Sequence, residues 1–401
     1  MKILLYSTYS PDMVDGASVS GRNLVRALRE RQVDVTVCTT DLGWTQNDID
    51  VHDDGRKDLH LFHAWFSHIL EISPGLMLSF YKTIRSFDVV HFRGAFSLGT
   101  VIGSFIARRF KRPYIISPVG DRLPSWNERS AISHGNVKYF YSKFLIRWAL
   151  QGANYIVCTS ETECNQITTA LNIRNVKVTS IPDGLTISSY STSVERSVLQ
   201  RKLGIMSDKT IYLFLGRLSK EKALEFLIEA WKKVVAQREN SVLVIAGDNK
   251  LNLKYVESLR KMIAVLGLSE SVILPGPVSG ELKNALLQHS CCLLLPSYRE
   301  SFGNVVLEAL ACGTPVLVSK GTPWECIESA GLGRWLPWDT DIWVEAMIER
   351  ANMAESMGKK FRLKSRRWVD DNFSWKKVVD RYIEVYQEAS KSRPLSSKGS
   401  G

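Results

Sequence analysis

The chain has 401 residues, 45% of them hydrophobic and 23% charged, which is typical of a globular protein large enough for two hydrophobic cores. Its seven cysteines are odd in number, lie mostly inside apolar runs and form no CxxC pair, which argues against a disulfide framework or a zinc site and favours a reducing cytoplasm. No run approaches the roughly 18 apolar residues of a membrane span, and the N-terminal residues resemble a first strand rather than a signal peptide.

The net charge of +11 is unevenly distributed along the chain. Residues 82–147 hold twelve lysines and arginines against three acids, and a second basic run covers residues 359–368. Solvated helix faces and an anionic partner both explain such runs, and both interpretations stay open. Among anionic partners, a membrane surface is favoured over nucleic acid, because no zinc-finger, RRM or KH signature accompanies the charge.

Short apolar runs alternate with helical patterns through the first half of the chain. Strands are expected over residues 2–8, 33–40, 89–94, 113–120, 153–160 and 176–184, and helices over residues 18–32 and 137–151. This alternation is typical of a doubly wound parallel α/β domain, expected over residues 1–185.

A polar stretch over residues 186–196, read as a linker, precedes a second run of the same alternation. Strands are expected over 210–217, 241–248, 271–278, 291–297 and 314–320, with helices over 222–237, 253–267, 281–289 and 304–313. A second doubly wound domain therefore covers residues 186–375, and a cleft between the two domains is expected at the carboxyl ends of their strands. An amphipathic helix follows over 376–390, and the tail 391–401 is expected to be disordered.

Two cations follow the strand that ends at Gly216. Arg217 and Lys222 are five residues apart and stand where this strand gives way to a helix, whose N-terminal amides already favour an anion. A guanidinium beside an ammonium group suits a diphosphate. Arg217 could instead pair with a neighbouring acid such as Glu221 while Lys222 is solvated, and spacing alone does not separate the two interpretations.

The segment RESFGNVVLEALACGTPVLVSKGTPW, residues 299–324, carries two carboxylates in an otherwise apolar run. Glu300 and Glu308 are eight positions apart, so on one helix they would lie about 12 Å apart and point about 80° from each other. A turn before the helix would instead let Glu300 and Glu308 flank an anion site made by the amides of Ser301, Phe302, Gly303 and Asn304. The alternative is that Glu300 caps the helix and Glu308 pairs with a lysine.

These motifs resemble the retaining GT-B glycosyltransferases of family 4. GRLSKEKALEFLIEA, LLLPSYRESFGNVVLEALACGTPVLVS and FSWKKVVDRYIEVY resemble the C-terminal half of that family, which has two glutamates with seven residues between them, as here. SPVGDRLPSW, TSETE and SIPDGL resemble its N-terminal half and domain junction, and GTPW is most similar to the branch that builds bacterial surface polysaccharide and lipopolysaccharide.

The resemblance implies a role for each matching residue. Arg217 and Lys222, after Gly216, would grip the donor diphosphate; Glu300 would hold the sugar hydroxyls and Glu308 the ribose. The amides from Ser301 to Asn304 would face the phosphates, and Gly16 would lie near the donor on the N-terminal side. The resemblance further implies a nucleotide-sugar donor, a glycan or lipid-linked acceptor, no metal or other cofactor, and a last helix that crosses back to the N-terminal domain. The cysteines separately indicate a cytoplasmic protein, and the basic runs leave peripheral contact with the anionic inner face of the membrane as an open interpretation.

The chain also departs from the family pattern, which leaves alternatives. Asp15-Gly16 stands where many relatives have Gly-Gly, and Val119 where many have histidine or arginine, so no catalytic group is assigned to the N-terminal half; His91 is read as a buried structural histidine. A non-hydrolysing UDP-sugar 2-epimerase of the same fold and a non-catalytic glycan-binding subunit remain as rival functions.

A few further residues are candidates for a metal site or a membrane contact. Two D-x-D pairs, Asp48 with Asp50 and Asp339 with Asp341, could hold a metal. His60, His63 and His68 could face one another on a helix, although a metal site there is not expected. The aromatic segment 59–81 is read as core, with an acceptor pocket or a membrane contact as the alternative.

Overall fold

The computed structural model describes residues 1–7, 16–41, 59–65, 73–95, 97–119, 141–247, 252–353 and 358–392. The chain divides into two compact units. Unit 1 comprises Met1–Gly184 together with Trp375–Gly401, and unit 2 comprises Leu185–Ser374. The first boundary falls one residue before the one expected from the sequence, and the final helix belongs to unit 1.

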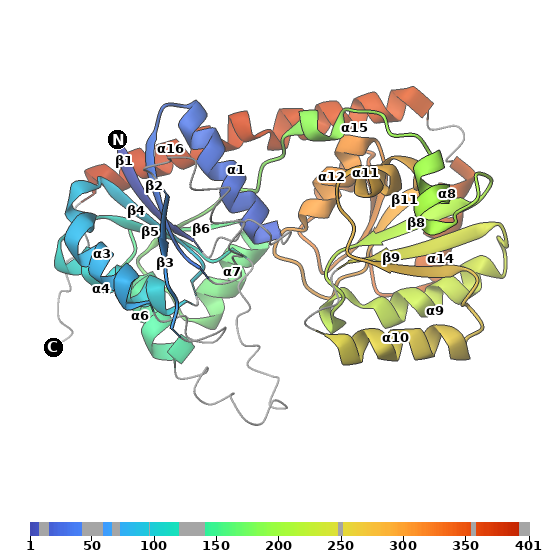
Figure 1. Cartoon of the computed structure of the whole chain (residues 1–401), viewed down its shortest axis with the longest axis horizontal. Helices are drawn as coiled ribbons and strands as arrows, with labels where there is room; N and C mark the ends of the chain where they lie inside the picture. Colours follow the sequence, from blue (N-terminus) through green and yellow to red (C-terminus); the bar gives the residue numbers. More distant parts are fainter. Residues whose placement is uncertain are drawn as a thin grey trace. The chain divides into compact units, whose positions relative to one another are not determined.

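Unit 1 is built on a seven-stranded parallel sheet with the strand order β3-β2-β1-β4-β5-β6-β7 (Figure 1). The strands are β1 (Lys2–Ser7), β2 (Asp34–Thr40), β3 (Leu59–Phe62), β4 (Val89–Arg93), β5 (Tyr114–Ser117), β6 (Tyr155–Cys158) and β7 (Lys177–Ser180). The central strands β1, β4 and β5 are almost wholly buried, as expected for a parallel sheet that is covered on both faces.

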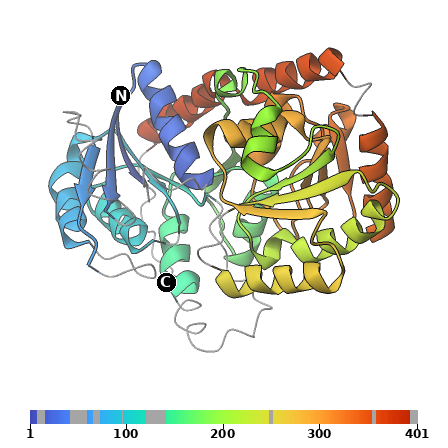
Figure 2. The same ribbon diagram turned by 45° about the vertical axis from the view of Figure 1, so that its right-hand side comes forward.

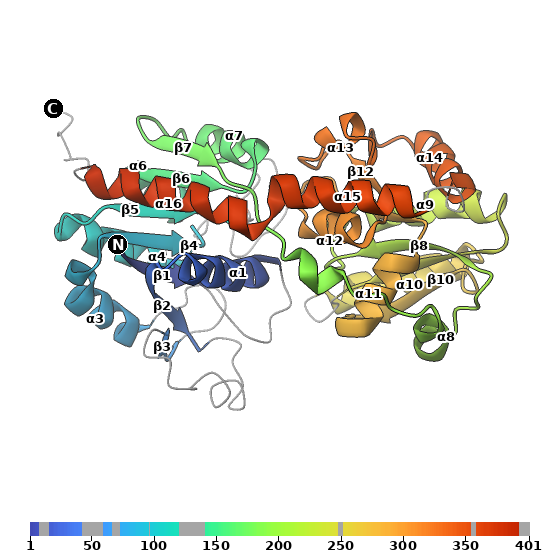
Figure 3. The ribbon, with the colours of Figure 1, turned by 90° about the horizontal axis from the view of Figure 1, so that it is seen from above.

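Helices cover both faces of this sheet. One face carries α1 (Gly16–Glu30) and α16 (Trp375–Lys391), which lie side by side in Figure 3 and share one hydrophobic cluster with β1 and β2. The other face carries α3 (Pro74–Thr83), α4 (Leu98–Arg109) and α6 (Arg147–Gln151) over a second cluster. The remaining elements of unit 1 are α7 (Glu161–Ala170), the 3-10 turn η1 (Ile84–Ser86) and the π-helical turn η2 (Tyr141–Ile146).

The terminal helix α16 is held by the spacing of its apolar residues. Val378, Tyr382, Tyr386 and Ala389 recur at intervals of three or four residues and are all buried, so one stripe of the helix faces the sheet. A helix that follows unit 2 in the sequence therefore completes the core of unit 1.

Unit 2 contains a six-stranded parallel sheet with the order β10-β9-β8-β11-β12-β13. Its strands are β8 (Thr210–Leu215), β9 (Ser241–Ala246), β10 (Val272–Gly276), β11 (Cys292–Leu295), β12 (Val316–Ser319) and β13 (Gly333–Leu336). Figure 1, and Figure 2 after a 45° turn, show α9 (Leu224–Val235) and α10 (Leu253–Val265) on one face and α11 (Gly280–His289) and α12 (Asn304–Cys312) on the other.

The other helical elements of unit 2 pack against these. They are η3 (Ile187–Tyr190), α8 (Ser197–Leu203), η4 (Lys220–Lys222), α13 (Cys326–Ser329), α14 (Thr340–Met353) and α15 (Gly358–Phe373). α15 contacts α12 and η3, and α14 contacts α9. In the described part of the chain, no helix is both long and apolar enough to cross a membrane.

The two doubly wound parallel sheets that the sequence predicts are confirmed, with two strands added. The short edge strands β3 and β13 carry too few residues to show a pattern. The predicted helix bearing His60 and His63 is wrong, because His60 lies in β3 and His63 follows it; His68 is outside the described residues. The aromatic segment 59–81 is only partly core: Phe80 is buried, whereas Leu78 and Tyr81 are exposed.

Candidate active site

Gly216 and Gly247 follow the neighbouring parallel strands β8 and β9, at the carboxyl end of the sheet. Gly216 donates its amide hydrogen to Ala246 over 3.0 Å, and a Cβ atom at Gly247 would lie only 1.6 Å from the carbonyl oxygen of Gly216. No side chain fits at Gly247, so the two backbones can approach each other closely. Arg217 directly follows Gly216, is exposed, and makes no ion pair or hydrogen bond with any described residue. The alternative in which Arg217 pairs with Glu221 is therefore wrong.

Lys222 and Glu300 form an ion pair between the turns that follow β8 and β11, at the carboxyl end of the sheet. The ammonium group of Lys222, from the turn η4 after β8, contacts Oε2 of Glu300, from the turn after β11; the two side chains are 13% and 15% exposed. Ser297 donates a second hydrogen bond to the same carboxylate oxygen over 3.2 Å. A carboxylate this far from solvent needs such partners. Lys222 is therefore not solvated.

Backbone hydrogen bonds fix the turn that carries Glu300 between its two neighbours. Tyr298 donates its amide hydrogen to the carbonyl of Glu221 over 2.8 Å, and Glu300 donates to the carbonyl of Gly321 over 3.0 Å. The turns that follow β8, β11 and β12 are thereby joined at the carboxyl edge of the sheet. Because the backbone is tied on both sides, the Lys222–Glu300 pair is held by the fold as well as by its own attraction.

The N-cap residue of α12 is Gly303, so Glu300 is not its cap. Gly303 has a φ of +86°, in the left-handed region where glycine is favoured, and a Cβ there would lie 3.1 Å from Cγ of Glu300. Among the described residues, the amide hydrogens of Phe302 and Gly303 have no acceptor. Together with the half-buried Ser301 and Asn304 at either side, they make this helix end suited to an anion.

Trp324, to which the sequence assigned no contact, supports this turn from below. Its indole N–H donates to the carbonyl of Phe302, and its ring lies 4.9 Å from the Phe302 ring, centroid to centroid. Phe373 packs on both rings, and Trp324 is 1% exposed. The Phe302 side chain is thus core, and only its amide is open to a ligand.

Glu308 lies two turns further along α12 and has different partners from Glu300. Its Oε1 atom accepts hydrogen bonds from the Tyr190 hydroxyl over 2.9 Å and from the Lys283 ammonium over 2.8 Å. Pairing of Glu308 with a lysine, which the sequence left open, is therefore the arrangement found. Neither Tyr190 nor Lys283 was identified from the sequence.

The N-terminal candidates lie in unit 1. Gly16 begins α1, and residues 8–15 before it are outside the described ranges. His91 is fully buried and bonds Tyr386 and Ser117, each over 2.8 Å, which confirms a structural histidine; burial, and secondarily the charge of Arg93, holds its pKa well below 6.5. Val119 has a φ of +54°, where a β-branched residue is strained by about 1–3 kcal/mol.

The metal candidates have structural roles or fall outside the described residues. Asp339 accepts the amide hydrogens of Asp341 and Ile342 at the start of α14, and Asp341 pairs with Lys233. Asp48 and Asp50 are not in the described part. Within that part, no group of three or more histidine, cysteine or acidic side chains could hold a metal ion.

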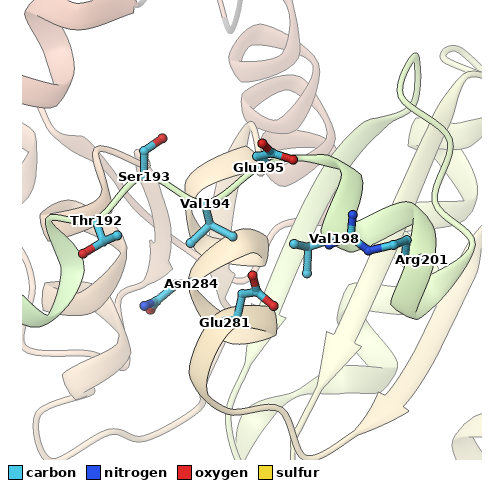
Figure 4. A pocket seen from close by; sticks show the side chains of 8 residues that line it. All are labelled: Thr192, Ser193, Val194, Glu195, Val198, Arg201, Glu281 and Asn284. Atoms are coloured by element: carbon cyan, nitrogen blue, oxygen red, sulfur yellow. The ribbon is translucent and has the colours of Figure 1, made fainter.

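A pocket of about 450 Å³ lies away from the strand ends, between residues 192–201 and α11 (Figure 4). Its charged lining residues are Glu195, Arg201 and Glu281, and none of the predicted site residues lines it. The two acids outnumber the single arginine among these lining residues, so the pocket does not favour an anionic ligand. We therefore place the candidate site at the strand ends and not in this pocket.

Two partners of the glutamates gave no signal in the sequence. Lys283 is one of several lysines on amphipathic helices, and nothing in its spacing relates it to Glu308, which is 25 positions away. Tyr190 lies in the polar stretch that was read as linker. Trp324 was visible as an unusual residue after GTP, but only the fold shows that it packs under the turn.

Comparison with known proteins agrees with this architecture. The model of the glycosyl transferases group 1 matches residues 195–336, and that of glycosyltransferase family 4 matches residues 14–188. An uncharacterized glycosyltransferase of Methanocaldococcus jannaschii is 28% identical over 239 residues, 58% of this chain, and this chain spans only 60% of that relative's length. The alpha-monoglucosyldiacylglycerol synthase of Streptococcus pneumoniae is 28% identical over 346 residues, 81% of this chain and 72% of the relative.

A solved structure shows the same fold at low sequence identity. HepE of Anabaena, in complex with UDP and glucose, superimposes with a TM-score of 0.72 at 18% identity, over 97% of this chain and 100% of that protein. Both sheets of this chain and both family models therefore lead to one assignment: the chain belongs to the GT-B glycosyltransferases of the group 1 and family 4 type.

Proposed function

We propose that this chain is a retaining glycosyltransferase that moves a sugar from a nucleotide-sugar donor to a glycan or lipid-linked acceptor in the synthesis of cell-surface polysaccharide or lipopolysaccharide. HepE of Anabaena was solved with UDP and, separately, with UDP-glucose, which supports a UDP-sugar as the first donor to test. The pneumococcal relative is named as a synthase of alpha-monoglucosyldiacylglycerol, a glucosylated lipid, which supports a lipid-linked acceptor.

The observation that carries this proposal is that Arg217 is exposed and has no partner among the described residues, at the same carboxyl end of the sheet as the Lys222–Glu300 pair. Arg217 and Lys222 bind the diphosphate of the donor, with the open amides of Phe302 and Gly303 at the start of α12. Glu300 then accepts hydrogen bonds from hydroxyls of the donor sugar, because an ionised carboxylate is an acceptor only.

Charge redistribution on the diphosphate drives the reaction in this proposal. The bond between the anomeric carbon and the phosphate oxygen breaks while the acceptor oxygen bonds the same face of the sugar, and the acceptor proton passes to the departing phosphate. Negative charge that grows on the phosphate meets Arg217, Lys222 and the helix amides, which are in place before the reaction. No metal ion and no separate protein base enters this sequence.

A screen followed by a stereochemical assay tests the proposal. Thermal shifts with UDP-, GDP- and ADP-sugars identify a donor, since a ligand that binds only the folded state raises apparent stability. Transfer to a lipid-linked glycan acceptor is then followed by NMR, with a product of unchanged anomeric configuration and equal rates with and without EDTA as the expected result. Inversion at the anomeric carbon would refute retention, and EDTA-sensitive transfer would refute metal independence.

Two controls separate the rival functions. Donor incubated without acceptor should hydrolyse slowly; inversion at C2 of the sugar would instead identify an epimerase. Absence of binding by every nucleotide-sugar and nucleoside diphosphate would favour a non-catalytic glycan-binding subunit.

We also propose peripheral contact of unit 1 with an anionic membrane. Unit 1 has exposed aromatic side chains and arginine–aromatic pairs: Phe105 and Phe144 are about 60% exposed, the guanidinium of Arg85 lies 4.0 Å from the Phe110 ring centre and that of Arg108 lies 4.4 Å from the Trp148 ring centre. Flotation with vesicles of phosphatidylglycerol should decrease as salt rises. No flotation at any salt concentration would refute the contact.

A further inference from the structure

In its contacts with the described residues, the carboxylate of Glu308 uses one of its two oxygens. Oε1 accepts both the Tyr190 hydroxyl hydrogen and the Lys283 ammonium hydrogen, whereas Oε2 has no partner among the described residues. The side chains of Glu308 and Lys283 are 13% and 20% exposed, so the pair is largely withdrawn from water. A fully used oxygen therefore stands beside one that can still accept hydrogen bonds.

Tyr190 is itself held in place relative to α12. Arg366, on α15, donates to the carbonyl of Tyr190 over 2.8 Å and to the carbonyl of Ala311, on α12, over 2.7 Å. Burial, and secondarily the negative charge of Glu308, raises the pKa of the Tyr190 hydroxyl well above 10, so this hydroxyl keeps its proton and remains a donor. The two hydrogen bonds of Arg366 thus hold the Tyr190 hydroxyl, a permanent donor, against Oε1 of Glu308.

The second donor neutralises the carboxylate without competing for its other oxygen. Lys283 comes from α11 and donates to Oε1 as Tyr190 does, so its positive charge is held at that oxygen and not at Oε2. A negatively charged group near a diphosphate would otherwise repel the donor. With the charge balanced and Oε2 open, the arrangement suits a neutral diol.

We propose that Tyr190 and Lys283 are positioning residues for ribose recognition: by occupying Oε1 of Glu308 they leave Oε2 to accept hydrogen bonds from the 2′- and 3′-hydroxyls of the nucleotide. This inference rests on the proposed function, since it takes the ligand of unit 2 to be a nucleotide. It extends that function to two residues that lie outside the glutamate motif, one of them in the polar stretch before α8.

Nucleotides with and without the ribose diol provide the test. The dissociation constants of UDP and 2′,3′-dideoxyuridine diphosphate are measured by calorimetry for the full chain, or those of the GDP or ADP pair if that base binds more tightly. The unmodified chain should prefer the ribonucleotide at least about tenfold, because hydrogen bonds to a charged acceptor are among the stronger ones. Glu308→Gln should remove most of this preference.

The decisive variants are Tyr190→Phe and Lys283→Met. Each should reduce the preference for the ribonucleotide at least about threefold while leaving the affinity for the dideoxy compound nearly unchanged. Tyr212→Phe, which removes a buried hydroxyl bonded to the Met347 carbonyl, and Lys233→Met, which breaks an exposed lysine–aspartate pair, are matched controls and should leave the preference intact.

The outcomes separate this inference from the function on which it rests. If Tyr190→Phe and Lys283→Met weaken both nucleotides alike, or leave the ratio unchanged, both residues are merely structural and the inference is wrong. An unmodified chain that binds UDP without any ribose preference also refutes it, although nucleotide binding then stands. If no nucleoside diphosphate binds, the proposed function fails first. Should one variant fail to fold, the other decides.

Discussion

The carboxyl ends of the two sheets carry similar residue types, which are buried in unit 1 and more exposed in unit 2. In unit 1, Arg93 at the end of β4 is 2% exposed and donates to Ser20 over 3.0 Å, and the Ser20 hydroxyl donates to Asp183. In unit 2, Arg217 after β8 is exposed and unpaired within the described residues. An arginine at a strand end is therefore no mark of a binding site by itself; what matters is whether its guanidinium group is exposed or, like that of Arg93, buried against its own unit.

The same contrast appears in the acids. Asp183 in unit 1 is 4% exposed and belongs to a buried relay of side chains from β4 and α1. Within the part of the chain that the structure describes, Glu300 in unit 2 bonds Lys222 and Ser297 through one oxygen, and it lies beside a helix end where the amides of Phe302 and Gly303 have no acceptor. Unit 1 uses its polar groups to attach α1 to the sheet, whereas unit 2 keeps capacity for a ligand.

The largest effect is expected in unit 1, on stability. Arg93→Met should lower the free energy of unfolding of unit 1 by about 3–5 kcal/mol, because it leaves Ser20 and Asp183 without the buried positive charge. Urea unfolding with hydrogen exchange resolved by peptide measures this for each unit. Arg217→Ala, the matched change at an exposed arginine, should alter stability by less than about 0.5 kcal/mol. An equal loss of unfolding free energy in both variants would contradict the contrast between the carboxyl ends of the two sheets.

The next effect is on activity and belongs to unit 2. Arg217→Ala and Glu300→Ala should each lower kcat/KM of transfer by about 100- to 1000-fold, the range for losing one preorganised contact to developing charge. Arg217→Ala should also weaken nucleoside diphosphate binding, while Glu300→Ala should largely spare it, because the diphosphate is common to donor and product but the sugar is not. Rates within threefold of the unmodified chain in either variant would contradict the site assignment.

The sequence predicts most strands of the two sheets, but it predicts fewer of the contacts within the candidate site. Long, strongly apolar strands such as β8 and β9 are readable because both their faces are buried, and the motif after β11 is readable from its resemblance to a family. β3 and β13 were missed because four-residue edge strands are not distinguishable from loops by pattern. Lys222 was identified from the sequence, but its pairing with Glu300 was not, because the two residues are 78 positions apart and are brought together by strand order and not by spacing.

The histidines give a third comparison, in the pH dependence of each unit. Burial lowers the pKa of His91 well below 6.5 and lowers that of His289 as well, so both stay neutral in the folded chain while the unfolded chain takes up a proton below about pH 6.5. The free energy of unfolding should therefore fall as pH drops through 6.5 toward the folded pKa, by up to about 1.4 kcal/mol per pH unit for each histidine.

The effect of acid should be larger in unit 1 than in unit 2. His91 is fully buried, whereas the Nε2–H of His289 donates to the carbonyl of Val194 over 2.7 Å, a contact that opposes the lowering of its pKa. His91→Gln should flatten the pH dependence of unit 1 between pH 4.5 and 6.5 and leave that of unit 2 unchanged. Hydrogen exchange at a series of pH values measures both, and a slope in unit 1 that survives His91→Gln would assign it to other groups.

The smallest effect sharpens the distinction within unit 2 itself. Lys233 and Asp341 approach within 2.7 Å, as closely as Lys283 and Glu308 do at 2.8 Å, yet their side chains are 52% and 83% exposed instead of 20% and 13%. Water and salt screen the exposed pair, so Lys233→Met should change the free energy of unfolding by less than about 1 kcal/mol, and the difference should vanish in 1 M salt. Lys283→Met should lower the free energy of unfolding more at either salt concentration, because among the described residues it leaves a largely buried carboxylate with the Tyr190 hydroxyl alone.

Urea titrations of both variants at low and high salt compare the two losses directly. Equal, salt-sensitive losses would mean that contact distance, and not burial, governs the contribution of these pairs to stability.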